Sequence, residues 1–258
     1  MPSPPSGSDN VLAGQIARIR EDNARLIQRL EETERRFRAI SRGVLRAQEA
    51  ERSRISRDLH DGVGQTLTAL KMQLDVLARE GGPDAPLAGR LAALRDMADA
   101  ALQEIRQISH AIRPQILDNL GLVATLRWLA RTFEARTGVR TTFACGELAT
   151  ARDPDVETLL YRVVQESLTN VTKHARASRV AIELAGNAGW LTLRVEDDGV
   201  GFDGARTAAR DDEVGFGLRS MRDRVRLFGG RFSVRSSVGA GTVVEVEVPA
   251  DATPEAVA

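Results

Sequence analysis

The chain has 258 residues, and its 36 basic residues balance 36 acidic ones, so the net charge is zero. This balance argues against a polycation built to bind nucleic acid, and the single cysteine, Cys145, excludes a disulfide framework or a cysteine-rich zinc site. No apolar run approaches the roughly 20 residues that a membrane helix needs, and the first ten residues do not resemble a signal peptide. We therefore expect a soluble, cytoplasmic protein with no membrane span and no nucleic-acid partner.

The N-terminal part of the chain predicts one very long helix. Residues 1–10 are rich in Pro, Ser and Gly and predict a disordered start. From Val11 to about Glu80 there is no proline and little glycine, and in residues 11–47 seam residues alternate spacings of three and four, with Asn23 at an a position. This heptad predicts a parallel dimeric coiled coil, although a helix that packs on its own domain would show a similar stripe. The seam is Ile16, Ile19, Asn23, Leu26, Leu30, Thr33, Phe37, Ile40, Val44 and Ala47.

A helical hairpin is expected over residues 48–113. A new apolar stripe replaces the heptad after residue 47, the GGPDAP segment at 81–86 breaks the chain, and a second helix runs from Leu87 to Ile112 before Pro114. Two antiparallel helices cannot bury both apolar stripes alone, whereas two copies form a four-helix bundle. The first stripe comprises Ile55, Leu59, Val63, Leu67, Leu70, Leu74 and Leu77.

Residues 114–249 have a mixed texture that predicts an α+β sandwich. The expected helices are 117–137, 153–175 and a helix that ends at 228, and the expected strands are 139–143, 180–184, 191–196, 231–236 and 242–248. A loop punctuated by glycines is expected at 197–217. Residues 250–258 are expected to form a loose tail.

Three weak motifs in this part of the chain are candidates for chemistry. Asn170 falls almost on the apolar face of its predicted helix with Glu166 one turn before it, so the pair needs either an internal hydrogen-bond network or a bound cation and polyphosphate. Asp197 ends a strand on its inward side, and the glycines that follow permit either a tight turn or the approach of a flat ligand. Two further glycines precede an amphipathic helix, where backbone N–H groups are suited to bind phosphate. The motif residues are Glu166, Asn170, Lys173, Asp197, Gly199, Gly201, Gly215 and Gly217.

Together, in this order and spacing, the motifs resemble the ATP-binding fold shared by gyrase B, MutL and sensor histidine kinases. The resemblance implies that Asn170 holds Mg²⁺ against the phosphates, with Glu166 polarising a water or the transfer site. It also implies that Lys173 and His174 neutralise phosphate charge, and that Asp197 reads the adenine amine. Gly199 and Gly201 would then shape the adenine pocket, Gly215 and Gly217 would contact phosphates, and residues 203–214 would form a mobile lid.

The hairpin helix carries the run Glu51-Arg52-x-Arg54-Ile55-x-Arg57-Asp58-Leu59-His60-Asp61-Gly62-x-Gly64-Gln65. Asp61 is placed to hold the His60 imidazole in one tautomer, which makes the other ring nitrogen a nucleophile. Gln65 lies one turn beyond Asp61 and is placed to position a water. The run resembles the phosphoacceptor box of the NarX/NreB/DesK-like histidine kinases, as do Arg113-Pro114 and the later glycines, so the resemblance covers roughly residues 48–249.

The resemblance implies a homodimeric histidine autokinase that passes the γ-phosphoryl group of ATP to His60. From there it would pass to an aspartate of a NarL/FixJ-type response regulator, which the Asp61-x-x-x-Gln65 pattern would also serve to dephosphorylate. Many relatives carry transmembrane sensor segments and this chain has none, so the input is expected from a cytosolic partner, from the coil, or from a longer protein. Two alternatives stay open: an ATPase or serine/threonine kinase such as an anti-sigma kinase, and a non-catalytic coiled-coil scaffold.

Overall fold

The computed structural model describes residues 7–80, 85–112, 115–148, 153–203 and 213–251. The chain divides into two compact units, Met1–Ala47 and Gln48–Ala258. Helix α1 (Gly7–Asp58) occupies the first unit and enters the second. Helix α1 begins at Gly7, inside the segment 1–10 for which a disordered start is predicted, and residues 1–6 lie outside the described part of the chain.

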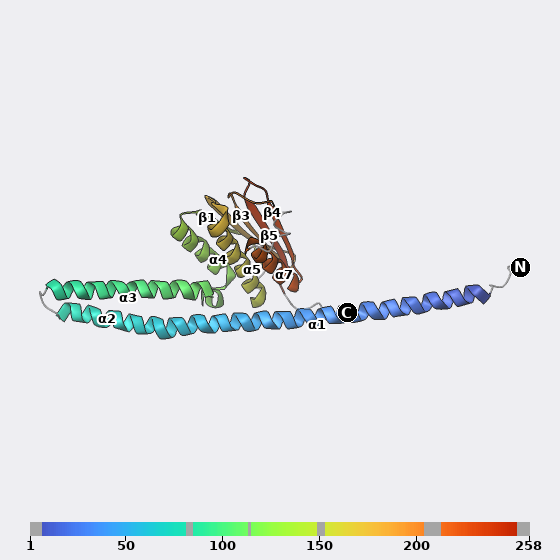
Figure 1. The fold of residues 1–258 in the computed structure, drawn as a ribbon, viewed down its shortest axis with the longest axis horizontal. Helices are drawn as coiled ribbons and strands as arrows, with labels where there is room; N and C mark the ends of the chain where they lie inside the picture. Colours follow the sequence, from blue (N-terminus) through green and yellow to red (C-terminus); the bar gives the residue numbers. More distant parts are fainter. Residues whose placement is uncertain (1–6, 81–84, 113–114, 149–152, 204–212, 252–258) are drawn as a thin grey trace. The chain divides into compact units, whose positions relative to one another are not determined.

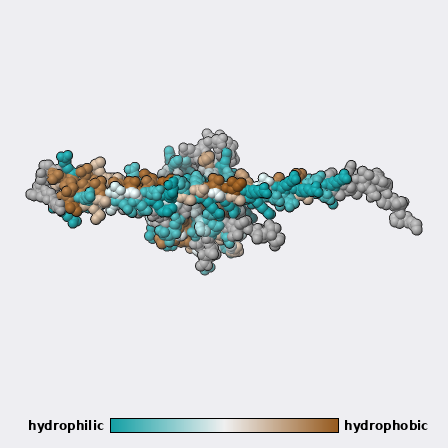
Figure 2. All heavy atoms as spheres, turned by 90° about the horizontal axis from the view of Figure 1, so that it is seen from below, coloured by the Kyte–Doolittle hydropathy of each residue, from teal (hydrophilic) through white to brown (hydrophobic). Residues whose placement is uncertain are grey.

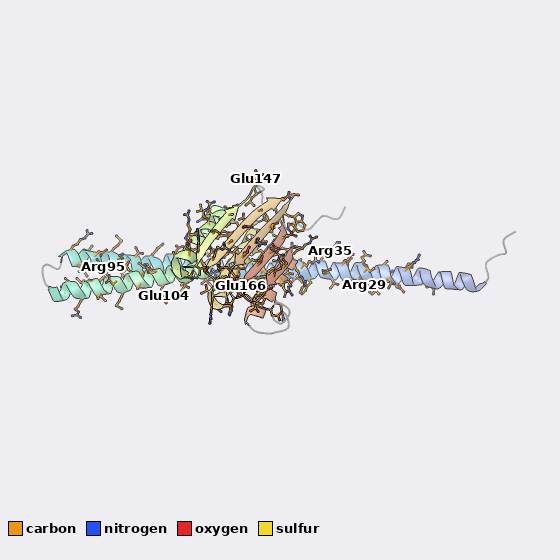
Figure 3. All side chains as sticks on the ribbon, turned by 90° about the horizontal axis from the view of Figure 1, so that it is seen from above. Arg29, Arg35, Arg95, Glu104, Glu147 and Glu166 are labelled. Atoms are coloured by element: carbon orange, nitrogen blue, oxygen red, sulfur yellow. The ribbon has the colours of Figure 1, made fainter. Side chains whose placement is uncertain are left out.

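The heptad seam of α1 is open to solvent in the single chain. Leu30 and Ile40 keep 70% and 69% of their surface exposed, and charged side chains such as Arg29 and Arg35 project from the same helix (Figure 3). A helix that exposes a largely apolar seam is suited to pair with another helix. The exposed seam residues also include Leu26, Phe37 and Val44.

The two helices expected for the hairpin are present, and the first of them contains a π-helical turn that the periodicity did not predict. Helix α1 passes into a π-helical turn, η1 (Leu59–Gly64), then into α2 (Gln65–Glu80), and α3 (Ala85–Ile112) returns beside α2 (Figure 1). Lys71 and Asp99 join α2 to α3 through a 2.6 Å ion pair. Residues 81–84 of the expected break, and Arg113-Pro114 beyond α3, lie outside the described residues.

Much of the apolar surface of the hairpin remains exposed. Leu74, Ala98 and Leu102 are buried between the helices, whereas many of the other large apolar side chains of the hairpin are not. Figure 2 shows these apolar residues gathered on the surface of the hairpin. The exposed members include Val63, Leu70, Met72, Val76, Leu77, Leu87, Leu94, Met97 and Ile108.

The five expected strands of the C-terminal part form one sheet, in the order β1-β2-β3-β5-β4. Strands β1 and β2 are parallel, and the other neighbours are antiparallel. The β2–β3 hairpin is longer than expected, because pairing continues to Asn187 and Trp190 around a two-residue turn in which Ala188 and Gly189 both have positive φ. The strands are β1 (Arg140–Cys145), β2 (Arg179–Asn187), β3 (Trp190–Asp197), β4 (Arg231–Ser236) and β5 (Thr242–Pro249).

Three helices pack together with this sheet and bury the alternate apolar residues of its strands (Figure 1). They are α4 (Gln115–Thr137), α5 (Pro154–Asn170) and α7 (Glu213–Leu227). Helix α4 is kinked at Gly121, whose φ of 73° and ψ of −178° are not helical. The α+β sandwich predicted from the element order is therefore confirmed. Its fully buried residues include Leu122, Leu126, Leu160, Val164, Ile182, Leu184, Leu193 and Val246.

Residue 250, the first of the predicted loose tail, is packed against the rest of the domain. Ala250 is buried, donates its N–H to the Gly189 carbonyl at 2.7 Å, and accepts the N–H of Asp153 at 3.0 Å. The last strand is thereby tied to the start of α5. Residues 252–258 of the expected tail lie outside the described part.

Candidate active site

The three motifs of the sandwich meet at the C-terminal end of α5, although the sequence separates them. A Cβ on Gly217 would lie 2.3 Å from Glu166 Oε1, and a Cβ on Gly199 would lie 2.4 Å from the carbonyl oxygen of Ala175. Val200 also donates its N–H to that Ala175 carbonyl at 2.8 Å. The backbone contact at Ala175 requires glycine, whereas the neighbour of Gly217 is the end of a flexible side chain. Both glycine motifs lie against the end of this helix.

Helix α5 places the first motif at its C-terminal end. It begins at Pro154, which suits the first helical position, after Asp153 accepts the N–H of Asp155 at 2.8 Å as an N-cap. Its apolar face is buried against the sheet, and Glu166 and Asn170 are half-buried at its far end (Glu166 is labelled in Figure 3). Asn170 is therefore not buried as its place on the apolar face predicted. The buried face includes Val156, Leu159, Leu160, Val163, Ser167 and Val171.

Beyond Asn170 the helix changes its hydrogen-bond register. Residues Val171–Ala175 form a π-helical turn, η2, and Arg176 ends it in the left-handed region at φ 50°. The sequence predicted one regular helix to Ala175, so the turn is a correction to that element. Lys173 and His174 lie on this turn with exposed side chains. The fold therefore does not bury these side chains, and an anion can reach them from solvent.

Asp197 occupies the inward position that the strand period predicted. Leu191, Leu193 and Val195 are buried along β3, and Asp197 follows half-buried at its end. Its Oδ1 accepts the N–H of Gly199 at 2.9 Å. Burial raises the pKa of this carboxyl above its usual range, against the opposing hydrogen bonds from the backbone N–H groups of Gly199 and Thr242.

Asp198 points to the opposite side and serves a different purpose. It accepts the Ser178 hydroxyl at 2.7 Å and the N–H groups of Ser178 and Arg179, both at 2.8 Å. These hydrogen bonds, the Ser178 hydroxyl first, lower the pKa of its exposed carboxyl. The first aspartate is thus free to meet a ligand on the inward side, while its neighbour stabilises the fold.

The glycines after Asp197 are required by the chain itself. Gly201 has a φ of 59°, and a Cβ there would lie 2.0 Å from the carbonyl oxygen of Ser237. Gly241 has a φ of 75°, and a Cβ there would lie 1.9 Å from the carbonyl oxygen of Asp197. The backbone around Gly199 and Gly201 is therefore tightly packed.

The last glycine motif lies within a helix instead of before it. Helix α7 begins at Glu213, so Gly215 and Gly217 belong to its first turns. The loop predicted over residues 197–217 therefore extends too far, because its last five residues are helical. The N-terminal end of a helix dipole favours anions, so the start of α7 is compatible with the expected phosphate contact. Residues 204–212 of the expected lid lie outside the described residues.

A cleft of about 560 Å³ opens beside Glu166, and the sequence motifs account for only part of its lining. Arg162 forms a two-point ion pair with Glu49 of α1, with Nε–Oε1 at 2.9 Å and Nη2–Oε2 at 2.6 Å. A contact across 113 residues leaves no signal in local periodicity, which is why sequence reasoning missed it. The lining is Arg52, Leu159, Arg162, Val163, Gln165, Glu166, Lys173, Phe216, Gly217, Ser220, Met221 and Arg224.

The helix with the candidate nucleophile differs from the regular helix that was expected. His60 and Asp61 lie in the π-helical turn η1, and Gln65 is the first residue of α2, so their spacing crosses the junction between two helix types. Asp61 and Gln65 are exposed, and Gln65 borders a second cavity, of about 360 Å³, between α2 and α3. The side chain of His60 lies outside the described residues.

The residues at the end of α5 fit a magnesium ion held mainly by phosphate. Among the described residues no group of three or more His, Cys, Asp or Glu side chains is arranged to hold a metal, so a cage built only of protein ligands is absent there. The Asn170 side chain makes no capping hydrogen bond and is half-exposed. Mg²⁺ commonly takes one or two protein oxygens together with phosphates and waters, which suits one amide oxygen beside a nucleotide.

Comparison with known families accounts for both parts of the second unit. Residues 51–117 match the family described as histidine kinase, and residues 155–252 match the histidine kinase-, DNA gyrase B- and HSP90-like ATPases. Together the two matches span more than half of the chain. The chain belongs to the histidine kinases of the NarX/NreB type.

Named relatives of this histidine kinase agree with the family matches. It is 36% identical to the sensor histidine kinase MctS of Rhizobium johnstonii, over 84% of this chain and 47% of that protein. It is 33% identical to the kinase/phosphatase DegS of Brevibacillus brevis (84% and 56%) and 34% identical to the oxygen sensor histidine kinase NreB of Staphylococcus carnosus (82% and 60%). The chain thus spans about half the length of the curated relatives it matches.

The histidine kinase domain of a blue-light-activated kinase from Erythrobacter litoralis aligns with 72% of this chain and 94% of its own length. The identity is 21% and the TM-score is 0.43. Within the described residues, no helix combines the length and the apolar character that a membrane crossing requires.

Proposed function

We propose that this histidine kinase autophosphorylates on His60 with ATP·Mg²⁺ and passes the phosphoryl group to an aspartate of a NarL-type response regulator. The observation that carries the proposal is the meeting of three motifs around the end of α5, where Gly199 contacts Ala175 and Gly217 contacts Glu166. This arrangement gathers an amide, a carboxylate, a lysine and a helix N-terminus in one place. Such a set suits phosphoryl transfer, which relies mainly on positioning and on neutralising charge.

Each group of the chain has a distinct role in this scheme. Asp197 accepts the exocyclic amine of adenine, and the first turn of α7 and Lys173 bind the phosphates. Asn170 contributes an oxygen to Mg²⁺, and the ion supplies charge neutralisation for the transferring group. His174, exposed beside Lys173, contributes to phosphate binding at the same end.

The transfer step itself joins the hairpin to the nucleotide. An imidazole nitrogen of His60 forms a bond to the γ-phosphorus while the bond from that phosphorus to the β,γ-bridging oxygen breaks, and ADP leaves. Asp61, the next residue, takes the proton from the other ring nitrogen as positive charge develops on the imidazole. Glu166 holds the geometry at the transfer site. The phosphoryl group then moves from nitrogen to a carboxylate oxygen of the regulator, which returns His60 to its starting form.

A homodimer is the assembly that the exposed apolar surfaces support. The seam of α1 and the stripes of α2 and α3 remain open in the single chain, and a second copy would cover both in a continuous coiled coil and four-helix bundle. The parallel register follows from Asn23 at an a position. The sensory input is proposed to come through a separate partner or a further segment joined to the coil.

The function is tested by the chemical stability of the label that [γ-³²P]ATP leaves on the wild-type chain. Phosphohistidine is labile in acid and stable in alkali, whereas phosphoserine is stable in acid. We expect label that acid removes and alkali spares. Acid-stable label would support the serine/threonine kinase instead, and ATP binding without any label would support the scaffold.

Replacing Gln65 with alanine is expected to separate the two activities toward the regulator. Gln65 is exposed at the start of α2 and is proposed to position the attacking water. Gln65→Ala should keep autophosphorylation within about twofold and slow regulator dephosphorylation by about 10²-fold, the lower end of what a lost general-catalysis contact costs. The measurement is the decay of phosphorylated regulator mixed with each kinase, and Thr68→Ala, on the same cavity, is the matched control. Unchanged decay would remove Gln65 from the phosphatase mechanism.

Replacing Asn170 with aspartate is expected to remove kinase activity and leave the dimer intact. The new carboxylate would stand one turn from Glu166 and beside the phosphates, where like charges repel. Label incorporated from [γ-³²P]ATP measures the activity, and the molecular mass of the variant in solution shows whether the dimer remains. Thr169→Ala, at the exposed neighbouring position, is the control. If Asn170→Asp retains activity, the ion is held elsewhere.

A further inference from the structure

Helix α1 contributes a cationic side chain to the cleft beside Glu166. The ion pair between Glu49 and Arg162 anchors this part of α1 to α5, and both partners are largely withdrawn from solvent, with 17% and 7% of their side-chain surface exposed. Arg162 also donates from Nη1 to Gln165 Oε1 at 2.6 Å. Three residues after Glu49, on the same side of the helix, Arg52 lines the cleft together with Glu166, Lys173 and Gly217.

The cleft holds more positive than negative charge. Four cationic side chains line it, Arg52, Arg162, Lys173 and Arg224, against one lining carboxylate, Glu166. The carboxylate of Glu49, whose charge also acts on Arg52, is already engaged by Arg162 on both oxygens. An anion in the cleft would therefore relieve repulsion among these groups.

Arg52 is the member of this set best placed to receive such an anion. It is half-buried, and within the described part of the chain it forms no hydrogen bond or ion pair of its own. Burial, and then the charges of Arg162 and Arg224 against that of Glu49, lower the pKa of its guanidinium, although an arginine stays protonated at any physiological pH. A withdrawn and unpaired guanidinium is costly unless a ligand supplies the missing negative charge.

We propose that Arg52 of the phosphoacceptor helix binds the terminal phosphate of ATP, so that the helical hairpin itself completes the nucleotide site. The inference rests on the proposed function, because it takes the cleft beside Glu166, Lys173 and Gly217 as the phosphate end of that site. The planar guanidinium offers two parallel N–H donors, a geometry suited to a phosphate.

The position of Arg52 along the helix defines the step in which it acts. It precedes His60 by eight residues, which corresponds to about 12 Å along a helix. Transfer requires the reacting atoms to approach to about 3–3.5 Å, so a phosphate held by Arg52 is bound but not yet placed for attack. Arg52 is thus a binding residue of the waiting complex, and its loss should raise the KM for ATP without lowering kcat.

The experiment compares ATP and ADP binding to the full chain by isothermal titration in the presence of Mg²⁺. Because a hydrogen bond to a charged group contributes about 1.5–3 kcal/mol, we expect Arg52→Gln to weaken ATP binding at least tenfold and to leave ADP binding within twofold. Arg54→Gln is the matched control, since Arg54 lies on the same helix, exposed and paired with Glu51. Arg52→Lys, which keeps the charge but not the fork, should fall between wild type and Arg52→Gln.

Three results would overturn the inference. ATP affinity within twofold of wild type in Arg52→Gln, or equal weakening of ATP and ADP, would remove Arg52 from the terminal phosphate. A fall in the rate of labelling at saturating ATP would place it in the transfer step instead. Failure of the proposed function is distinguishable, because the wild type would then carry no acid-labile label from [γ-³²P]ATP, whether or not it binds the nucleotide.

Discussion

Replacing His60 with glutamine is expected to abolish autophosphorylation completely while ATP still binds with wild-type affinity. Glutamine keeps the length and polarity of the side chain and removes the only ring nitrogen at this position that can accept the phosphoryl group. His60 lies in η1, apart in sequence from every motif of the sandwich, so the nucleotide site should be unaffected. The measurement is incorporation of label from [γ-³²P]ATP, beside isothermal titration with ATP on the same preparation.

The matched control for this experiment is His110→Gln, a second histidine of the hairpin, which lies on α3. It should be labelled like the wild type. Label that persists in His60→Gln would place the phosphoryl group on another residue, and the interpretation of the phosphoacceptor helix would fall. Loss of both label and ATP binding would show instead that the substitution disturbs the domain as a whole.

Elements whose identity is set by local apolar periodicity could be predicted well from the sequence. The long helix, the return helix of the hairpin and all five strands are found close to the predicted positions, because one buried face imposes a period of 3.6 or 2 on each. The inward direction of Asp197 follows from the same rule. The large apolar residues of the heptad, from Leu26 to Val44, are exposed in the single chain.

Features that depend on backbone register or on distant partners could not be predicted in this way. The π-helical turns at Leu59–Gly64 and Val171–Ala175 leave the pattern of apolar residues almost unchanged and alter only which carbonyl each N–H meets. The pair of Glu49 and Arg162 depends on the packing of two helices far apart in sequence. Both π-helical turns carry proposed site residues, in keeping with the tendency of such turns to occur at functional sites.

The glycines of the site show how one residue type satisfies two requirements at once. An adenine-binding role was expected for Gly199 and Gly201, yet each is also demanded by contact with the backbone of the chain itself. Packing of Gly199 on the Ala175 carbonyl fixes the distance between its motif and the end of the helix. Binding geometry and folding are therefore coupled at these positions, and a substitution there would not separate the two.

Substitutions at Asp197 and Asp198 are expected to separate ATP binding from fold stability. The same change to asparagine should affect ATP binding at Asp197 and thermal stability at Asp198. Asp197→Asn should weaken ATP binding at least tenfold, because an amide cannot accept from the adenine amine in the way a carboxylate does and a site built to pair a buried polar group loses much when the match fails. Its thermal stability should be no lower than that of the wild type. Asp198→Asn should bind ATP normally and have a lower Tm.

The opposite directions of the two pKa shifts explain this contrast. The folded pKa of Asp197 is raised above its unfolded value, so its charge opposes folding at neutral pH, and the fold gains stability as pH falls through the raised pKa. The folded pKa of Asp198 is lowered, so its charge stabilises the fold above the unfolded pKa, and that stability is lost as pH falls through the folded pKa. Replacing Asp197 with asparagine removes a charge that opposes folding, whereas replacing Asp198 with asparagine removes a charge that stabilises the fold.

Thermal unfolding and isothermal titration of both variants at pH 7 and pH 5 provide the test. For the wild type, ATP affinity should decline toward acid pH as Asp197 takes up a proton and ceases to accept the amine hydrogen bond. For Asp197→Asn that decline should be absent, because the titrating group is gone. Wild-type ATP affinity in Asp197→Asn would show that adenine is recognised elsewhere. An unchanged Tm in Asp198→Asn would mean that its three hydrogen bonds to Ser178 and Arg179 contribute little, as exposed contacts can.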